Sequence, residues 1–110
     1  MLWVLLLTKA PNTPDAKVCL RMALTATSSG DEAHLYLVGD GVLYVTKGHP
    51  REATIRRLLE TGCKVYAKKE DLEARGIREN QLVEGVIVPD DLMDEFMDEI
   101  RKEDCKVVCF

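Results

Sequence analysis

Four cysteines are the residues of this sequence with the clearest potential for chemistry. They are Cys19, Cys63, Cys105 and Cys109. A cysteine acts as a nucleophile only as its thiolate, and an unperturbed thiol with a pKa of about 8.5 is mostly protonated at neutral pH. A reactive cysteine therefore needs an exposed sulfur atom and a positively charged neighbourhood. Free cysteines are also among the most frequently buried residues, so each of the four has a packing alternative.

The pair Cys105 and Cys109 is spaced four residues apart in a strand-like segment. In an extended chain that spacing separates the two Cα atoms by about 13 Å. A disulfide needs Cα atoms within about 7 Å, and zinc needs ligand atoms about 2.3 Å from one centre. Neither fits this pair while it is extended, and we predict no metal site and no cofactor.

A second candidate site combines Asp40 with Lys68 and Lys69. Asp40 stands between two glycines that separate apolar runs, and Asp-Gly in this setting is typical of a β-hairpin. If residues 34–38 instead form a parallel strand, Asp40 and Gly41 lie at its carboxyl end, where α/β sheets place ligands. The two lysines would share that edge and would hold an anion or lower the pKa of a partner's thiol. The alternative role of Asp40 is hydrogen bonding within its own turn.

The elements that must position these residues alternate along the chain. Five apolar runs alternate with amphipathic segments, which is the pattern of βαβ units with a parallel sheet. The apolar runs are residues 2–7, 34–38, 63–67, 85–88 and 106–110. Near-continuous apolar strands are expected where helices cover both faces of a sheet. We therefore predict an α/β fold, a three-layer α/β/α sandwich with a mainly parallel five-stranded sheet, and favour this over the hairpin.

Four helices are expected between these strands. They cover about residues 15–28, 50–61, the segment KKEDLEARG at 68–76, and 90–103. In the first, Cys19 lies near the middle of the apolar face, which favours burial in the core over reactivity. In the third, Asp71 and Arg75 have the spacing of a helical ion pair.

Length and charge limit the classes of protein that remain. A chain of 110 residues is expected to be one domain, residues 1–110. The net charge is −4 with an acidic run at residues 90–104, whereas a dedicated nucleic-acid-binding protein shows a basic stripe. The opening MLWVLLL is too short for a signal sequence or a membrane span. We expect a cytoplasmic protein without membrane contact or direct nucleic-acid binding.

Several short motifs occur in an order that resembles a known family. They are KAP, CLRMAL, GDEAHLYLVGDGV, KVYAKKEDLEARGI and VIVPDDL. This order resembles the DsrE/DsrF/DsrH (TusB/TusC/TusD) sulfur-relay proteins, most closely the DsrH/TusB branch. The resemblance implies a DsrEFH-like parallel sheet between helices and assembly into multimers. It also implies relay of persulfide sulfur, for 2-thiouridine formation on tRNA or for sulfur oxidation.

The resemblance also bears on individual residues. The sulfur-carrying cysteine of the DsrE/TusD branch lies at the end of the third strand, and Lys68 occupies that place here. Some DsrH-type members carry a cysteine on the first helix, which Cys19 matches. We therefore expect an accessory, non-catalytic subunit of a sulfur-relay complex rather than a turnover enzyme. A persulfide carrier that uses Cys19 or Cys109 is the alternative.

Two further expectations concern what the chain binds. A third hypothesis is that the chain is a small-anion-binding module. Its binding site would be the edge formed by Asp40, Gly41, Lys68 and Lys69. The expected protein partners are DsrE/TusD-type subunits or further copies of this chain. The apolar segment GVLYV at residues 41–45 is the expected interface, because exposed apolar patches usually mark contacts.

Overall fold

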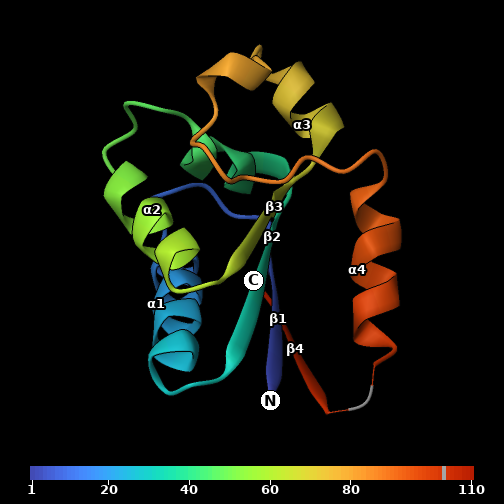
Figure 1. Ribbon diagram of the computed structural model, residues 1–110. Coiled ribbons are helices and arrows are strands. Elements are labelled where there is room, and N and C mark those ends of the chain that lie inside the picture. The colour runs from blue at the N-terminus through green and yellow to red at the C-terminus, as the bar shows by residue number, and fades with distance from the viewer. Residues whose placement is uncertain (103) are drawn as a thin grey trace.

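The computed structural model describes residues 1–102 and 104–110, and the strands there form one parallel sheet (Figure 1). The strand order is β3-β2-β1-β4, and each neighbouring pair runs parallel. The strands are β1 (Leu2–Leu7), β2 (Glu32–Leu37), β3 (Lys64–Ala67) and β4 (Cys105–Cys109). The α-helices are α1 (Pro14–Ser28), α2 (Glu52–Glu60), α3 (Lys69–Ala74) and α4 (Leu92–Ile100), and two 3₁₀ helices are η1 (Gly39–Val45) and η2 (Glu79–Gln81). The predicted α/β fold with a mainly parallel sheet is confirmed.

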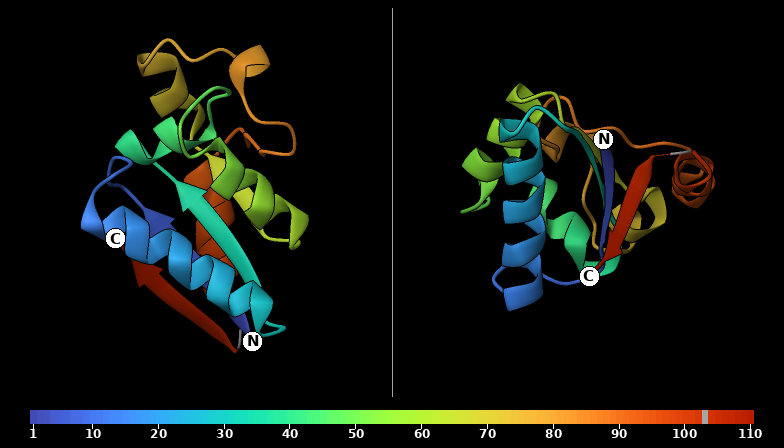
Figure 2. Two further views of the ribbon diagram at one scale, coloured as in Figure 1. Left: turned by 90° about the vertical axis from the view of Figure 1, so that its left-hand side faces the viewer. Right: turned by 90° about the horizontal axis from the view of Figure 1, so that it is seen from below.

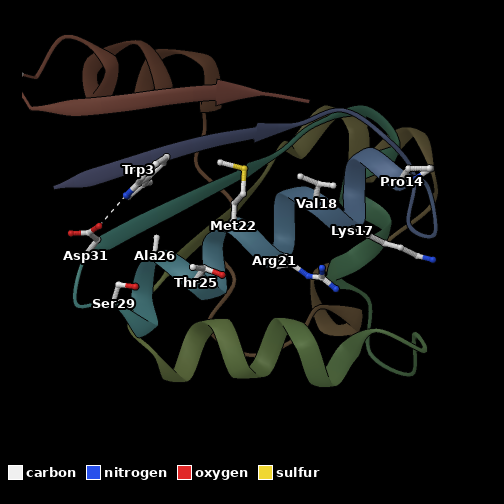
Figure 3. Close-up of a pocket in the computed structure, with 10 residues that line it drawn as sticks. All are labelled: Trp3, Pro14, Lys17, Val18, Arg21, Met22, Thr25, Ala26, Ser29 and Asp31. Atoms are coloured by element: carbon white, nitrogen blue, oxygen red, sulfur yellow. Dashed lines mark hydrogen bonds between the residues drawn. The ribbon is translucent and has the colours of Figure 1, made fainter.

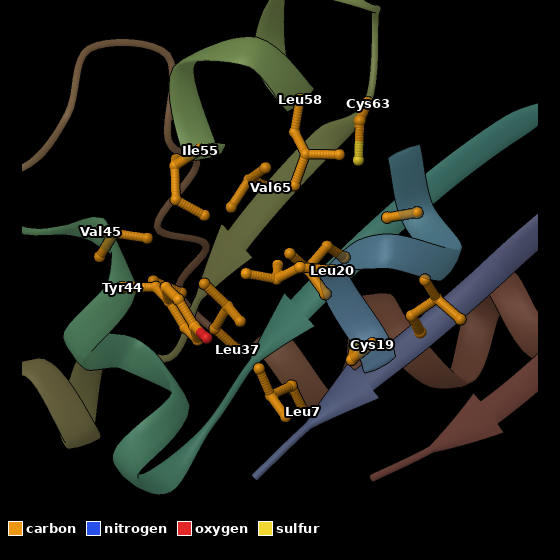
Figure 4. Packing of buried hydrophobic residues seen from close by; sticks show 14 of the residues in the cluster. Leu7, Cys19, Leu20, Leu37, Tyr44, Val45, Ile55, Leu58, Cys63 and Val65 are labelled. Atoms are coloured by element: carbon orange, nitrogen blue, oxygen red, sulfur yellow. The ribbon is translucent and has the colours of Figure 1, made fainter. Parts of the chain in front are cut away.

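Helices pack against both faces of the sheet. α1 and α2 lie on one face and α4 on the other (Figure 2). On the first face, Leu7 of β1 and Ile55 of α2 belong to the larger apolar cluster (Figure 4). On the second, Val4 packs in a cluster with Phe96 of α4. Successive residues of a strand point to opposite faces, so β1 must be apolar along its whole length.

The start of α1 follows from two adjacent residues. The hydroxyl of Thr13 accepts a hydrogen bond from the N–H of Ala16 at 3.2 Å, which satisfies a donor that a helix otherwise leaves unpaired. Pro14 stands in the first turn, where its missing N–H costs nothing. Ala16, Cys19 and Ala23 are fully buried against the sheet. The predicted burial of Cys19 on this helix is confirmed.

The prediction of a fifth strand at residues 85–88 is wrong, because the part of the chain that the structure describes forms four. Ile87 alone pairs with β3: its N–H donates to the carbonyl of Val65 at 2.8 Å, and its carbonyl accepts from Ala67 at 2.9 Å. Gly85 turns the chain just before it, with φ +101°. Two hydrogen bonds form a bridge but are too few for a strand.

The segment after β2 is neither a hairpin arm nor an exposed interface. It forms η1, in which Val42, Tyr44 and Val45 are buried. The expected apolar interface at residues 41–45 is therefore wrong, since these side chains complete the core instead. The parallel alternative for residues 34–38 is confirmed in β2, which pairs with β1 and β3 in the same direction.

α4 is joined to the sheet by a buried polar pair as well as by apolar contacts. Nδ1 of His34 in β2 lies 2.6 Å from Oε2 of Glu99, and both side chains are buried. The helix ends at Ile100, and the predicted end at Glu103 lies outside the described residues. Across residues 1–102 and 104–110, no helix is long and apolar enough to cross a membrane.

Candidate functional site

The carboxyl ends of β2 and β3 lie side by side and carry the predicted binding residues. Leu37 and Ala67 are register partners at these ends. The N–H of Lys68 donates to the carbonyl of Leu37 at 3.0 Å, so the residue that follows β3 is held against the end of β2. Asp40 and Lys68 therefore follow neighbouring strands at one edge of the sheet, as a parallel arrangement requires.

Asp40 is bound to Arg75 rather than to a lysine. Nη2 of Arg75 lies 2.8 Å from Oδ1 of Asp40. The carboxylate of Asp71, one turn earlier in the chain, accepts the N–H of Gly39 at 2.7 Å and lies 3.8 Å from Nη1 of Arg75. These contacts fasten the start of η1 to α3. The predicted Asp71–Arg75 pair is confirmed, whereas the Asp40–Arg75 contact was missed.

Gly41 has a packing role at this edge. It is buried, and a Cβ atom at its position would lie 2.5 Å from the carbonyl oxygen of Leu7. Its N–H donates to the carbonyl of Val38 at 3.0 Å. The absence of a side chain thus lets η1 pass close to the end of β1. Close packing therefore accounts for a glycine at this position, and no ligand is needed to explain it.

The two lysines lie in different surroundings. Lys68 is partly buried at the N-terminus of α3, and Lys69 is exposed. Lys69 borders a hollow of about 320 Å³ that also contains Glu73, Glu79 and Asp90. Three carboxyl groups beside one lysine make this hollow unfavourable for an anion. The geometry therefore gives little support to an anion site centred on Lys69.

Cys19 and Cys63 are both core residues. Their exposed fractions are 0% and 2%, and both lie among the side chains between α1, α2 and the sheet (Figure 4). Burial raises the pKa of each thiol to about 12. A thiol of this kind is protonated at neutral pH and out of reach of a partner. Cys19 thus occupies the position that the family resemblance indicates, but in a setting suited to packing.

The remaining two cysteines belong to β4. Burial raises the pKa of Cys105 above its ordinary value, and the nearby Glu99 carboxylate adds to the effect. Cys109 is exposed at the carboxyl end of β4 and pairs in register with Leu6. Beyond it, the N–H and hydroxyl of Thr8 donate to the carbonyl of Phe110 at 2.9 and 2.7 Å. Cys109 is therefore the accessible thiol at the same sheet edge as Asp40.

The strand order also favours the carboxyl end of β4 as the place of a functional site. The chain passes from β1 outward to β2 and β3, and β4 then adds on the other side of β1. Open α/β sheets place their ligands where the strand order reverses, at the carboxyl ends of the strands. Here that point lies between β1 and β4, beside Cys109 and away from Lys69.

Comparisons with known proteins agree with this architecture. The model of a family described as DsrH like protein matches residues 10–105. The uncharacterized protein MK0008 of Methanopyrus kandleri is 36% identical over 77 residues. That match covers 64% of this chain and 64% of the relative, so it spans less than two thirds of the relative's length.

Solved structures share the fold at low sequence identity. The ychN protein from E. coli has a TM-score of 0.83 at 21% identity and is covered completely, as is this chain. MTH1491 from Methanobacterium thermoautotrophicum, a protein of unknown function, has a TM-score of 0.81 at 14% identity over 99% of this chain and 98% of its own. At these identities the likeness shows the fold alone.

Proposed function

Because this chain belongs to the DsrH like protein family, we propose that it is an accessory subunit of a sulfur-relay complex. In this role it binds sulfur-carrying partners of the DsrE/TusD type without taking up sulfur itself. The relay serves 2-thiouridine formation on tRNA or sulfur oxidation, and the complex is cytoplasmic. The chain acts as one DsrH/TusB-like domain over residues 1–110, a three-layer sandwich with four strands among residues 1–102 and 104–110.

One observation carries the accessory role. The residue that follows β3, where the sulfur-carrying branch has its cysteine, is Lys68, held in place through its backbone. The thiols of Cys19 and Cys63 are buried and have a raised pKa, which disfavours the attacking thiolate that sulfur transfer requires. The features needed for relay chemistry are therefore missing where the carrier branch has them.

The test uses a persulfidated protein of the DsrE/TusD type mixed with this chain. We expect a stable complex in size-exclusion chromatography and no gain of a sulfur atom in the intact mass of this chain. Stoichiometric sulfur transfer onto it would contradict the accessory role. The Lys68→Cys variant is a positive control, because it places a thiol at the relay position.

A second candidate function is favoured by the exposure of Cys109. In this alternative the Cys109 thiolate attacks the outer sulfur of the partner's persulfide, a new sulfur–sulfur bond forms, and the partner leaves as its thiolate. Sulfur uptake by the wild-type chain that Cys109→Ala abolishes would establish this carrier role. Cys19→Ala is the matched control, and sulfur uptake that only this variant abolishes would assign the role to Cys19.

A further inference from the structure

The outward surface of α1 carries two stripes of different character. Val18 and Met22 form an apolar stripe, and Lys17 and Arg21 form a cationic stripe beside it (Figure 3). Val18 is 50% exposed. The apolar stripe borders an open groove of about 690 Å³ that extends to Trp3 of β1. The groove thus combines apolar and charged residues along one side of α1.

The outward surface of α4 carries the matching pattern with the opposite charge. Met93 and Met97 are 39% and 42% exposed and form an apolar stripe. Asp94 and Asp98 form an acidic stripe beside it, and both are exposed. Asp98 also lies 3.6 Å from Arg101, an exposed ion pair of the kind that contributes little.

Spacing and handedness make the two surfaces complementary. In each stripe the two residues are four apart, so each stripe has the same rise of about 6 Å along its helix. On α1 the charged residue of each adjacent pair precedes the apolar one, and on α4 it follows, as in Lys17-Val18 and Met93-Asp94. When two helices with these opposite orders face each other and run parallel, apolar meets apolar and cation meets carboxylate. The antiparallel arrangement mismatches both.

We propose that α4 of one copy docks along α1 of a second copy, with the helices parallel. Met93 and Met97 then cover Val18 and Met22, while Asp94 and Asp98 face Lys17 and Arg21. A chain cannot make this contact with itself, since its own α1 and α4 lie on opposite faces of the sheet (Figure 2). The contact between α4 and α1 therefore requires a second copy.

This contact is heterologous, because α4 of one copy binds α1 of the next and the two surfaces are different. Heterologous contacts generate a ring if the rotation closes and a filament if it does not. α1 and α4 point the same way within one chain (Figure 1), so neighbouring copies stack with their sheets in a similar direction. The proposal goes beyond the accessory role, and it holds whether or not this chain carries sulfur.

The first test compares oligomeric states by light scattering and sedimentation. The wild-type chain should form an oligomer that salt weakens, because opposite charges face each other across the contact. Lys17→Glu with Arg21→Glu, and separately Asp94→Lys with Asp98→Lys, should each give monomers. The exposed pair Arg57→Glu with Lys64→Glu is the control for charge and should leave the oligomer intact. Circular dichroism confirms that each variant is folded.

The second test mixes the two monomeric variants. The α1 variant is acidic on both surfaces and the α4 variant is basic on both, so every contact between the two variants pairs opposite charges and the mixture should form an oligomer that contains both. A chain carrying all four reversals should assemble again. A monomeric wild-type chain, an oligomer that survives both double reversals, or variants that do not pair on mixing would each overturn the proposal. None of these outcomes bears on sulfur uptake, so the accessory role is tested separately.

Discussion

His34 and Glu99 join β2 to α4 through a buried polar contact between residues 65 positions apart in the chain. Nδ1 of His34 lies 2.7 and 2.6 Å from the two carboxylate oxygens of Glu99. The two residues are only 7% and 5% exposed, in a region that Tyr36 and Tyr66 fill with rings stacked 4.4 Å apart. The position of α4 is thus fixed by a polar contact inside an otherwise apolar layer.

Removing one partner of this pair should be costly. Glu99→Ala leaves the buried imidazole without its acceptor, and we expect the free energy of unfolding to fall by about 2–4 kcal/mol. Glu95→Ala, on the exposed side of the same helix, should change it by less than about 0.5 kcal/mol. Urea unfolding followed by circular dichroism measures both. Equal stability of the two variants would show that the pair does not hold α4.

The acceptor of the Gly39 N–H should matter more than the exposed ion pair beside it. Asp71→Ala removes that acceptor and should cost about 1–2 kcal/mol of unfolding free energy. Asp40→Ala breaks an ion pair whose carboxylate side chain is 58% exposed, and should cost less than about 0.5 kcal/mol. Urea unfolding distinguishes the two variants. A larger loss for Asp40→Ala would mean that we have assigned the supporting contact to the wrong carboxylate.

The stability of the protein should decline at high pH because of its buried thiols. Burial raises the pKa of Cys19 and Cys63 from 9.0 to about 12. Between these values the unfolded chain has released the thiol protons and the folded chain has not, so stability falls as pH rises through that window. Below pH 9.0 the contribution is fully present. The tyrosines Tyr36, Tyr44 and Tyr66 have a pKa raised by burial and act in the same direction at higher pH.

Urea unfolding at a series of pH values from about 8 upward measures this effect, at about 1.4 kcal/mol per pH unit for each fully protected thiol. Cys63→Ala should lower stability below pH 9.0, where the wild-type thiol is protonated in both states, and should make the decline at higher pH less steep. An unchanged slope would show that Cys63 ionises equally in both states.

The four thiols should react in a defined order in the native protein. With a chromogenic disulfide reagent, Cys109 should react first because it is exposed, and Cys105 more slowly because it is partly buried. Cys19 and Cys63 should react only as the chain unfolds. The fast phase should vanish in Cys109→Ala and persist in Cys63→Ala. Rapid labelling of Cys19 would instead show that its thiol is accessible and would support the hypothesis that Cys19 carries sulfur.

Local signals were sufficient for the elements that depend on neighbouring residues. Thr13 and Pro14 predicted the start of α1, because a cap acts within one turn. The alternation of apolar runs with helices predicted parallel strands. The prediction of a strand at residues 85–88 was wrong because strand pairing depends on distant residues. The composition of this segment suits a strand, but only Ile87 pairs with the backbone of β3.

In the candidate site, too, contacts between neighbouring residues could be predicted from the sequence and contacts between distant residues could not. That Asp40 and Lys68 share an edge follows from strand direction, and Asp71 with Arg75 follows from helical spacing. The contact from Arg75 to Asp40 spans 35 positions and depends on how α3 is placed over η1. Around Lys69, Glu73 lies one turn along the same helix, whereas Glu79 and Asp90 come from later segments of the chain. The sequence held one indication of the Arg75–Asp40 contact, since α3 and η1 follow neighbouring strands.

The pairing of β1 with β4 has a kinetic consequence. Residues 2–6 are register partners of residues 105–109, so nearly the whole chain lies between two adjacent strands. Closing so long a loop costs entropy before the contacts compensate for it, and proteins dominated by such distant pairings fold slowly. We expect β1, β2 and β3 to assemble with α1 and α2 first. Until β4 arrives, one side of β1 presents unsatisfied backbone groups, and intermolecular strand pairing during refolding should occur there.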